Sequence, residues 1–135
     1  MMVVGFGFDP IPGLTQLKPE VTYLLVLNGP KANQYFSLNR LRSLIGRSHP
    51  PHIIVDIDLS GYEPSLPTTI SRHHAVIQWA NNKLQIIDLA SRNGTFVNGQ
   101  QLTPPSADRP SDPVVLTVGS KIKLGNLEFA IVVAG

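Results

Sequence analysis

From residue 21 onward, short runs of β-branched and aliphatic residues alternate with turn residues, and helical periodicity is absent. Runs of this length that end at glycine, proline or asparagine are typical of strands in an all-β sandwich or barrel. The expected strands are residues 21–27, 34–39, 43–47, 53–59 (a strand or an extended segment), 75–79, 84–88, 95–97, 114–118, 121–124 and 127–133. The pattern therefore predicts an all-β fold.

Polar turn residues join the expected strands. Asn81-Asn82 separates two β-rich runs and predicts a hairpin, and Asn98-Gly99 suits a type I′ turn. A Gly125-Asn126 turn closes the last hairpin. Segments 60–69 and 103–113 contain several prolines and are expected to be loops, because proline cannot donate to a sheet ladder.

Length and composition indicate one folded domain. The chain has 135 residues, of which 42% are hydrophobic and 15% are charged, so it can bury a core and is not a disordered segment. Residues 1–20 contain three prolines and three glycines and are expected to form an irregular N-terminal arm. The predicted organisation is this arm followed by a single domain over residues 21–135.

Charge and composition also exclude several classes of protein. The formal net charge is +2 and the basic residues are dispersed, which argues against a dedicated nucleic-acid surface. The chain has no cysteine, so disulfides, thiolate metal sites and cysteine nucleophiles are excluded. It shows no basic leader and no apolar stretch near the ~18 residues of a membrane span, so we expect neither export nor membrane insertion, and a cytoplasmic location.

Three segments carry the chemistry expected of a receptor for a phosphorylated side chain: Gly46-Arg47, the segment 71–74 (SRHH) and the segment 93–99 (NGTFVNG). Arg47 offers a rigid fork of donors that matches phosphate oxygens, and the Ser71 hydroxyl adds a short donor. Asn93 has both donor and acceptor groups and can hold the backbone of an extended peptide. Each segment lies in or beside a turn, so all three can meet at one end of a sandwich, which predicts binding rather than catalysis.

In their order along the chain, these segments resemble the signature of the forkhead-associated (FHA) domain family. The resemblance spans roughly residues 21–133 and is carried by Gly46-Arg47, by 56–59 (DIDL), 70–75 (ISRHHA), 88–99 (DLASRNGTFVNG) and 119–125 (GSKIKLG). It implies a sandwich of two antiparallel sheets whose loops at one end bind phosphothreonine in an extended segment of a partner protein. The expected partner is a threonine-phosphorylated protein, such as a Ser/Thr kinase or its substrate, and the expected role is that of a signalling adaptor.

The resemblance also assigns roles to individual residues. It implies that Arg47 and Ser71 contact the phosphate with help from Arg72, and that Asn93 holds the peptide backbone with Arg92 beside it. The positions that match those holding the binding loops in the family are Gly46, His74, Gly94, Asn98 and Gly99.

The long loop 60–69 and its neighbours are the expected source of ligand selectivity. In this family, neighbouring loops discriminate the residue three positions after the phosphothreonine. Thr69, Arg92 and Asn126 are the candidates in this chain, and Arg92 points to an acidic ligand residue.

Other functions were weighed against this one. Ser71 with His74 superficially offers a nucleophile and a base, but Ser71 lies in no G-x-S-x-G elbow, so we expect no enzyme. A metal site built from the four histidines is disfavoured because adjacent side chains on a strand point to opposite faces. We expect no cofactor. The sequence leaves open a phosphate-independent protein-binding scaffold built on the same sandwich.

Overall fold

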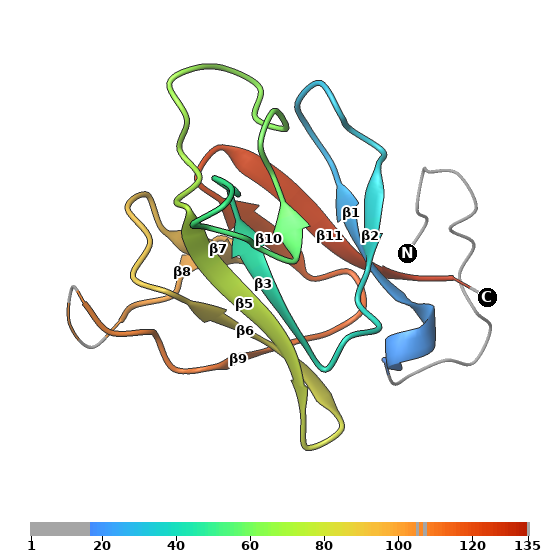
Figure 1. The fold of residues 1–135 in the computed structure, drawn as a ribbon. Coiled ribbons are helices and arrows are strands. Elements are labelled where there is room, and N and C mark those ends of the chain that lie inside the picture. Colours follow the sequence, from blue (N-terminus) through green and yellow to red (C-terminus); the bar gives the residue numbers. More distant parts are fainter. Residues whose placement is uncertain (1–16, 105, 107, 135) are drawn as a thin grey trace.

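The apolar runs fold into strands that form two packed sheets, which confirms the predicted sandwich (Figure 1). The computed structural model describes residues 17–104, 106 and 108–134. The first sheet has six strands in the order β2 (Tyr35–Ser37), β1 (Thr22–Val26), β11 (Leu127–Val133), β10 (Lys121–Leu124), β7 (Thr95–Val97) and β8 (Gln100–Gln101). The second has five in the order β4 (Ile57–Asp58), β3 (Arg42–Gly46), β5 (His73–Ala80), β6 (Lys83–Asp88) and β9 (Val114–Leu116).

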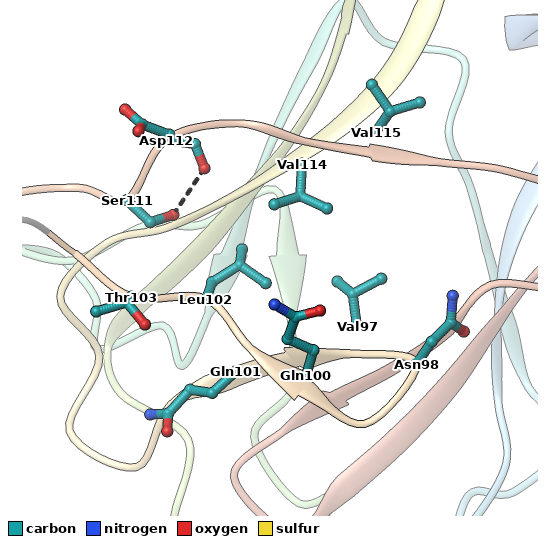
Figure 2. Close-up of a pocket in the computed structure, with 10 residues that line it drawn as sticks. All are labelled: Val97, Asn98, Gln100, Gln101, Leu102, Thr103, Ser111, Asp112, Val114 and Val115. Carbon is teal, nitrogen blue, oxygen red and sulfur yellow. Dashed lines mark hydrogen bonds between the residues drawn. The ribbon is translucent and has the colours of Figure 1, made fainter.

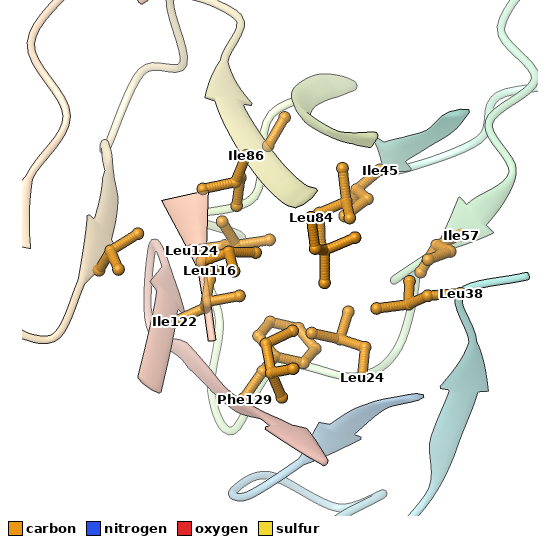
Figure 3. Packing of buried hydrophobic residues seen from close by; sticks show 14 of the residues in the cluster. Leu24, Leu38, Ile45, Ile57, Leu84, Ile86, Leu116, Ile122, Leu124 and Phe129 are labelled. Carbon is orange, nitrogen blue, oxygen red and sulfur yellow. The ribbon is translucent and has the colours of Figure 1, made fainter. Parts of the chain in front are cut away.

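The core lies between the two sheets. Strand β10 shows why the sequence folds this way, because buried Ile122 and Leu124 alternate with exposed lysines, as one buried face requires. Phe129 is fully buried on β11, and Leu84 and Ile86 of the opposite sheet belong to the same cluster. Figure 3 shows these side chains pointing into one interior.

Residues 53–59, predicted as a strand or an extended segment, form a strand over only part of their length. Only β4 forms there, and it pairs in parallel with β3, so the second sheet is mixed rather than wholly antiparallel. The Asp56 carboxylate accepts the Leu44 N–H at 2.8 Å, and the Asp58 carboxylate accepts the N–H groups of Ser48 and Ser60, each at 3.1 Å. These side chains take backbone donors that a longer strand would pair, so the ladder stops.

The turns predicted between strands are confirmed. Asn81 and Asn82 form the β5–β6 hairpin, both with positive φ. Asn98 and Gly99 have φ values of 50° and 85°, as a type I′ turn requires. The loop over 60–69 contains no strand, and neither do the described residues between 103 and 113.

Most of the predicted N-terminal arm lies outside the described residues. Within the described part, Leu17 is buried in the core cluster, and Pro19–Val21 form one short 3₁₀ turn, η1. In the part of the chain that the structure describes, no helix is long and apolar enough to cross a membrane.

The register of β1 and β11 fixes the two ends of the sandwich. Thr22 lies opposite Val133 at one end, and Val26 lies opposite Phe129 toward the other. The chain leaves β1 after Val26 and enters β11 at Leu127 through the 125–126 turn, so this second end carries the loops described next.

Candidate functional site

The three segments singled out in the sequence come together at one end of the sandwich. The Arg47 N–H donates to the Arg72 carbonyl at 3.1 Å, which joins the end of β3 to the loop before β5. The Arg92 N–H donates to the Ser71 hydroxyl oxygen at 3.0 Å, which joins that loop to the β6–β7 loop. The Gly125 N–H donates to the Gly94 carbonyl at 3.2 Å and adds the β10–β11 turn.

Arg47 follows directly after β3 and is partly buried. Its Nε–H donates to the Ile70 carbonyl at 2.5 Å, which leaves the two terminal nitrogens of the guanidinium without a hydrogen bond to the described residues. The preceding Gly46 is required by close approach, because a Cβ there would collide with the Arg72 backbone carbonyl. The pairing of β3 with β5 shifts register between Ile45 and Gly46, and this bulge is where the chain turns out of the sheet.

Ser71 is held by both its backbone and its side chain. Its N–H donates to Nδ1 of His74 at 3.0 Å, and its hydroxyl oxygen accepts the Arg92 N–H. Because the hydroxyl acts only as an acceptor in these bonds, its proton remains available for an external acceptor.

His74 is fully buried beneath these loops. Nδ1 accepts the Ser71 N–H, so the ring proton lies on Nε2 and is donated to the Gly94 carbonyl at 3.0 Å. Burial lowers the pKa of the His74 imidazole below its usual range, although the Gly94 carbonyl and the charges of Asp88 and Glu63 oppose this shift. The ring is therefore a neutral link between two binding loops.

Asn93 and the flanking arginines lie at the exposed rim. The Asn93 Nδ2 donates to the Thr69 carbonyl at 3.0 Å, which connects two loops. Arg72 and Arg92 are exposed. Among the described residues the one ion pair joins Arg40 to Asp56, so neither of these arginines, nor Arg47, is neutralised by a carboxylate.

A buried carboxylate that sequence reasoning did not single out builds the β6–β7 loop. Asp88 is 1% exposed, and its Oδ1 accepts the hydroxyl groups of Ser91 at 2.5 Å and Thr95 at 2.7 Å. Ser91 in turn accepts the Gly94 N–H at 3.0 Å. The signal that could have revealed Asp88 is an acidic residue at a strand end with hydroxyl residues three and seven positions later.

Thr69 and Asn126, the candidates for selectivity, are joined to each other. The Thr69 hydroxyl oxygen accepts the Asn126 N–H at 2.8 Å and donates its own proton to Glu63 at 2.5 Å. Glu63 is a second residue that sequence reasoning did not select, because its contacts depend on how the 60–69 loop folds back. The Thr69 hydroxyl is thus occupied by contacts between loops.

The Asn98-Gly99 turn is not part of this group. It lies at the far end of the three-residue strand β7 from Gly94, roughly 10 Å away at the usual rise of about 3.3 Å per residue. Asn98 pairs with Lys121, since its Oδ1 accepts the Lys121 N–H and its own N–H donates to the Lys121 carbonyl, each at 2.8 Å. Its contacts hold the β7–β8 turn against β10.

A separate pocket of about 520 Å³ opens between the β7–β8 hairpin and β9 (Figure 2). Leu102 and valines of both elements line it, together with Ser111, Asp112 and neutral polar side chains. No lysine, arginine or histidine lines the pocket, so it offers a phosphate no cation. Among the described residues there is no cluster of three His, Asp or Glu side chains able to hold a metal ion.

Comparison with known proteins agrees with this architecture. A family model of the FHA domain matches residues 43–125. The glycogen accumulation regulator GarA of Mycobacterium tuberculosis is 29% identical over 119 residues, which cover 88% of the chain. The chain spans 62% of the length of GarA.

Similar folds occur among solved structures, two of which illustrate the likeness. Mycobacterium tuberculosis EmbR, in complex with a low-affinity phosphopeptide, has a TM-score of 0.64 and 28% identity, over 85% of this chain and 25% of EmbR. A structure studied for phosphothreonine-dependent FHA domain interactions has a TM-score of 0.60 and 25% identity, over 82% of this chain and 94% of its own.

Proposed function

The chain belongs to the FHA domain family, and we propose that it recognises phosphothreonine in an extended segment of a partner protein through the loops around Ser71. Arg47 and Ser71 hold the phosphate, with Arg72 adding positive charge. Asn93 holds the peptide backbone, with Arg92 beside it.

The observation that carries this proposal is that Arg47 and the backbone of Arg92 are both bonded to the Ile70-Ser71 segment, where the Ser71 hydroxyl proton remains available. Arg47 is bonded to the carbonyl of Ile70, the residue before Ser71, and Arg92 is bonded through its N–H to the Ser71 hydroxyl. A phosphate dianion needs charge-assisted donors from several directions, and a guanidinium supplies them in a fixed fork. Because no carboxylate of the described residues neutralises these arginines, their attraction for an anion is not offset in that part of the chain.

The same geometry favours binding over catalysis. A serine nucleophile needs a base within hydrogen-bond reach, and His74 is the histidine that is bonded to Ser71, through the Ser71 N–H. Both nitrogens of His74 are committed to backbone groups, namely the Ser71 N–H and the Gly94 carbonyl. The imidazole therefore cannot accept the Ser71 hydroxyl proton without breaking the loop structure. The name of GarA describes a regulator, which agrees with a non-enzymatic role.

The proposed partner is a threonine-phosphorylated protein, such as a Ser/Thr kinase or its substrate, and the domain acts as an adaptor in the cytoplasm. The phosphopeptide bound to the similar EmbR structure supports this ligand class. The folded domain over residues 21–135 carries the activity.

Fluorescence polarisation with peptide libraries tests the proposal. Phosphothreonine peptides should bind, phosphoserine peptides more weakly, and unphosphorylated peptides of the same sequences not measurably. Equal binding of the unphosphorylated library would show instead that the domain is a phosphate-independent scaffold.

A further inference from the structure

One carboxylate holds the start of the segment that carries Ser71. Glu63 Oε1 accepts the Thr69 N–H at 2.6 Å and the Thr69 hydroxyl at 2.5 Å, and Oε2 accepts the Ile70 N–H at 3.3 Å. Two successive backbone N–H groups around an anion form a nest, and each such bond is charge-assisted. Glu63 is partly buried and forms no ion pair with the arginines of the site. The charge of Glu63 therefore stabilises the loop through these hydrogen bonds and does not neutralise the arginines of the site.

The peptide unit between Thr69 and Ile70 links this carboxylate to Asn93. The Ile70 N–H belongs to that unit and donates to Glu63, while the Thr69 carbonyl belongs to the same unit and accepts the Asn93 Nδ2–H at 3.0 Å. A trans peptide unit is planar, so its N–H and its C=O point in opposite directions and rotate together. Fixing the N–H on Glu63 therefore fixes the direction in which the carbonyl meets Asn93.

The Thr69 side chain extends the link to a third loop. Its hydroxyl donates to Glu63 and accepts the Asn126 N–H at 2.8 Å. Because the hydroxyl has one proton, donation to Glu63 orients its lone pairs toward the β10–β11 turn. Glu63 thus governs both contacts that Thr69 makes with neighbouring loops.

From these contacts we propose that Glu63 is a positioning residue for ligand binding, which holds the Asn93 amide in place through the Thr69–Ile70 peptide unit. This inference rests on the proposed function, in which Asn93 holds the peptide backbone. Its consequence is that Glu63 acts on the peptide and not on the phosphate, because the phosphate-contacting Ser71 lies in the next peptide unit, whose N–H is held by His74.

A double-mutant cycle tests this link. Titration with one phosphothreonine peptide, chosen from the library that binds the wild-type domain, compares Glu63→Ala, Asn93→Ala and the double variant. Glu63→Ala should weaken binding by about fivefold, on the scale of one lost contact. In the Asn93→Ala background the same change should have an effect below about twofold, because the group it positions is gone. Equal losses in both backgrounds, or no loss in either, would overturn the inference.

Two further measurements separate positioning from folding. Glu63→Gln keeps an acceptor oxygen and should recover part of the affinity, and Glu20→Ala removes an exposed carboxylate elsewhere and should bind like the wild type. If Glu63→Ala does not fold, the Asn93 side-chain amide resonances of Glu63→Gln decide the matter: they should shift from their wild-type positions, and unchanged resonances would refute the link. A wild-type domain that ignores phosphorylation would instead refute the proposed function itself.

Discussion

The N–H of Ser71 donates to Nδ1 of His74, and the carbonyl of the same peptide unit, that of Ile70, accepts the Nε–H of Arg47. Because the unit is planar, the buried imidazole fixes the orientation of the carbonyl that holds the guanidinium. The proposed phosphate contacts therefore depend on a neutral His74, although that ring is fully buried beneath them.

Acidification should destabilise the domain through His74. Its folded-state pKa is lowered by burial, so between that value and the unfolded value of about 6.5 the unfolded chain binds the extra proton and the folded chain does not. The free energy of unfolding should hence be independent of this residue above about pH 7 and should fall as the pH drops through 6.5. Urea denaturation at a series of pH values between 7.5 and 5 measures this.

Two histidine variants serve as controls for that pH series. His74→Gln cannot titrate at this position. The slope of its free energy of unfolding against pH should lack the contribution of His74, whatever the absolute stability of the variant. His73→Ala changes the exposed neighbour and should keep the wild-type slope. A wild-type slope that matches His74→Gln would contradict the prediction.

Arg47→Ala should weaken phosphopeptide binding by about thirtyfold or more, because truncating a charge-assisted contact in a partly desolvated site costs roughly 2–5 kcal/mol. Arg47→Lys should be intermediate, since it keeps the charge but loses the fork and the Nε–H bond to Ile70. Arg42→Ala, an exposed arginine at the other end of β3, provides the matched control and should bind normally. Calorimetric titration measures all three, and equal affinities for Arg47→Ala and Arg42→Ala would refute the role of Arg47.

Ser71→Ala should cost phosphopeptide affinity by about tenfold, the range expected for a hydrogen bond to a charged group of about 1.5 kcal/mol. The variant also leaves the Arg92 N–H without its acceptor, so the β6–β7 loop should exchange its amide protons faster. Ser65→Ala changes an exposed serine of the loop 60–69, which precedes Ser71. It should change neither the phosphopeptide affinity nor the amide exchange of the β6–β7 loop. A binding titration measures the loss of phosphopeptide affinity, and amide hydrogen exchange of the same variants measures the loosening of the β6–β7 loop.

Asn93→Ala should weaken binding of a phosphothreonine peptide more than binding of free phosphothreonine, because Asn93 is proposed to hold peptide backbone rather than phosphate. A loss of about fivefold for the peptide is expected, as for one hydrogen-bonded contact. Asn39→Ala, which changes an exposed asparagine in the connection between β2 and β3, is the comparison. A variant that lost affinity equally for both ligands would place Asn93 on the phosphate instead.

Local sequence signals predicted the strands and turns well where neighbouring residues decide the conformation. The hairpin at Asn81-Asn82 and the turn at Asn98-Gly99 follow from the tolerance of these residues for positive φ. The strand over 53–59 was overpredicted because its β-branched composition outweighed Asp56, whose side chain competes for backbone donors.

The sequence predicted which segments form the site but not the hydrogen bonds that join their loops. Arg47, Ser71 and Asn93 could be selected because their chemistry suits a phosphopeptide, and the resemblance to a family fixed their order. Glu63 could not be selected, because a carboxylate that caps a loop is distinguished from a solvated one only by how that loop folds. Asp88 left only a faint signal, the hydroxyl residues Ser91 and Thr95 that follow the strand end. Residues that hold others in place leave a weaker signal than residues that contact ligand.

The facing positions of Thr22 and Val133 have a practical consequence for how the domain can be attached to other proteins. Antiparallel partners lie about 5 Å apart at their Cα atoms, so strand β1 begins and strand β11 ends at nearly one point. The seven residues of β11 separate that point from the turn beside Gly94. Attachment of a fusion partner, a surface tether or a host loop at residue 134 would therefore leave Arg47, Arg72 and Arg92 facing away from the attachment point. The sandwich could thus be inserted into another protein as a unit.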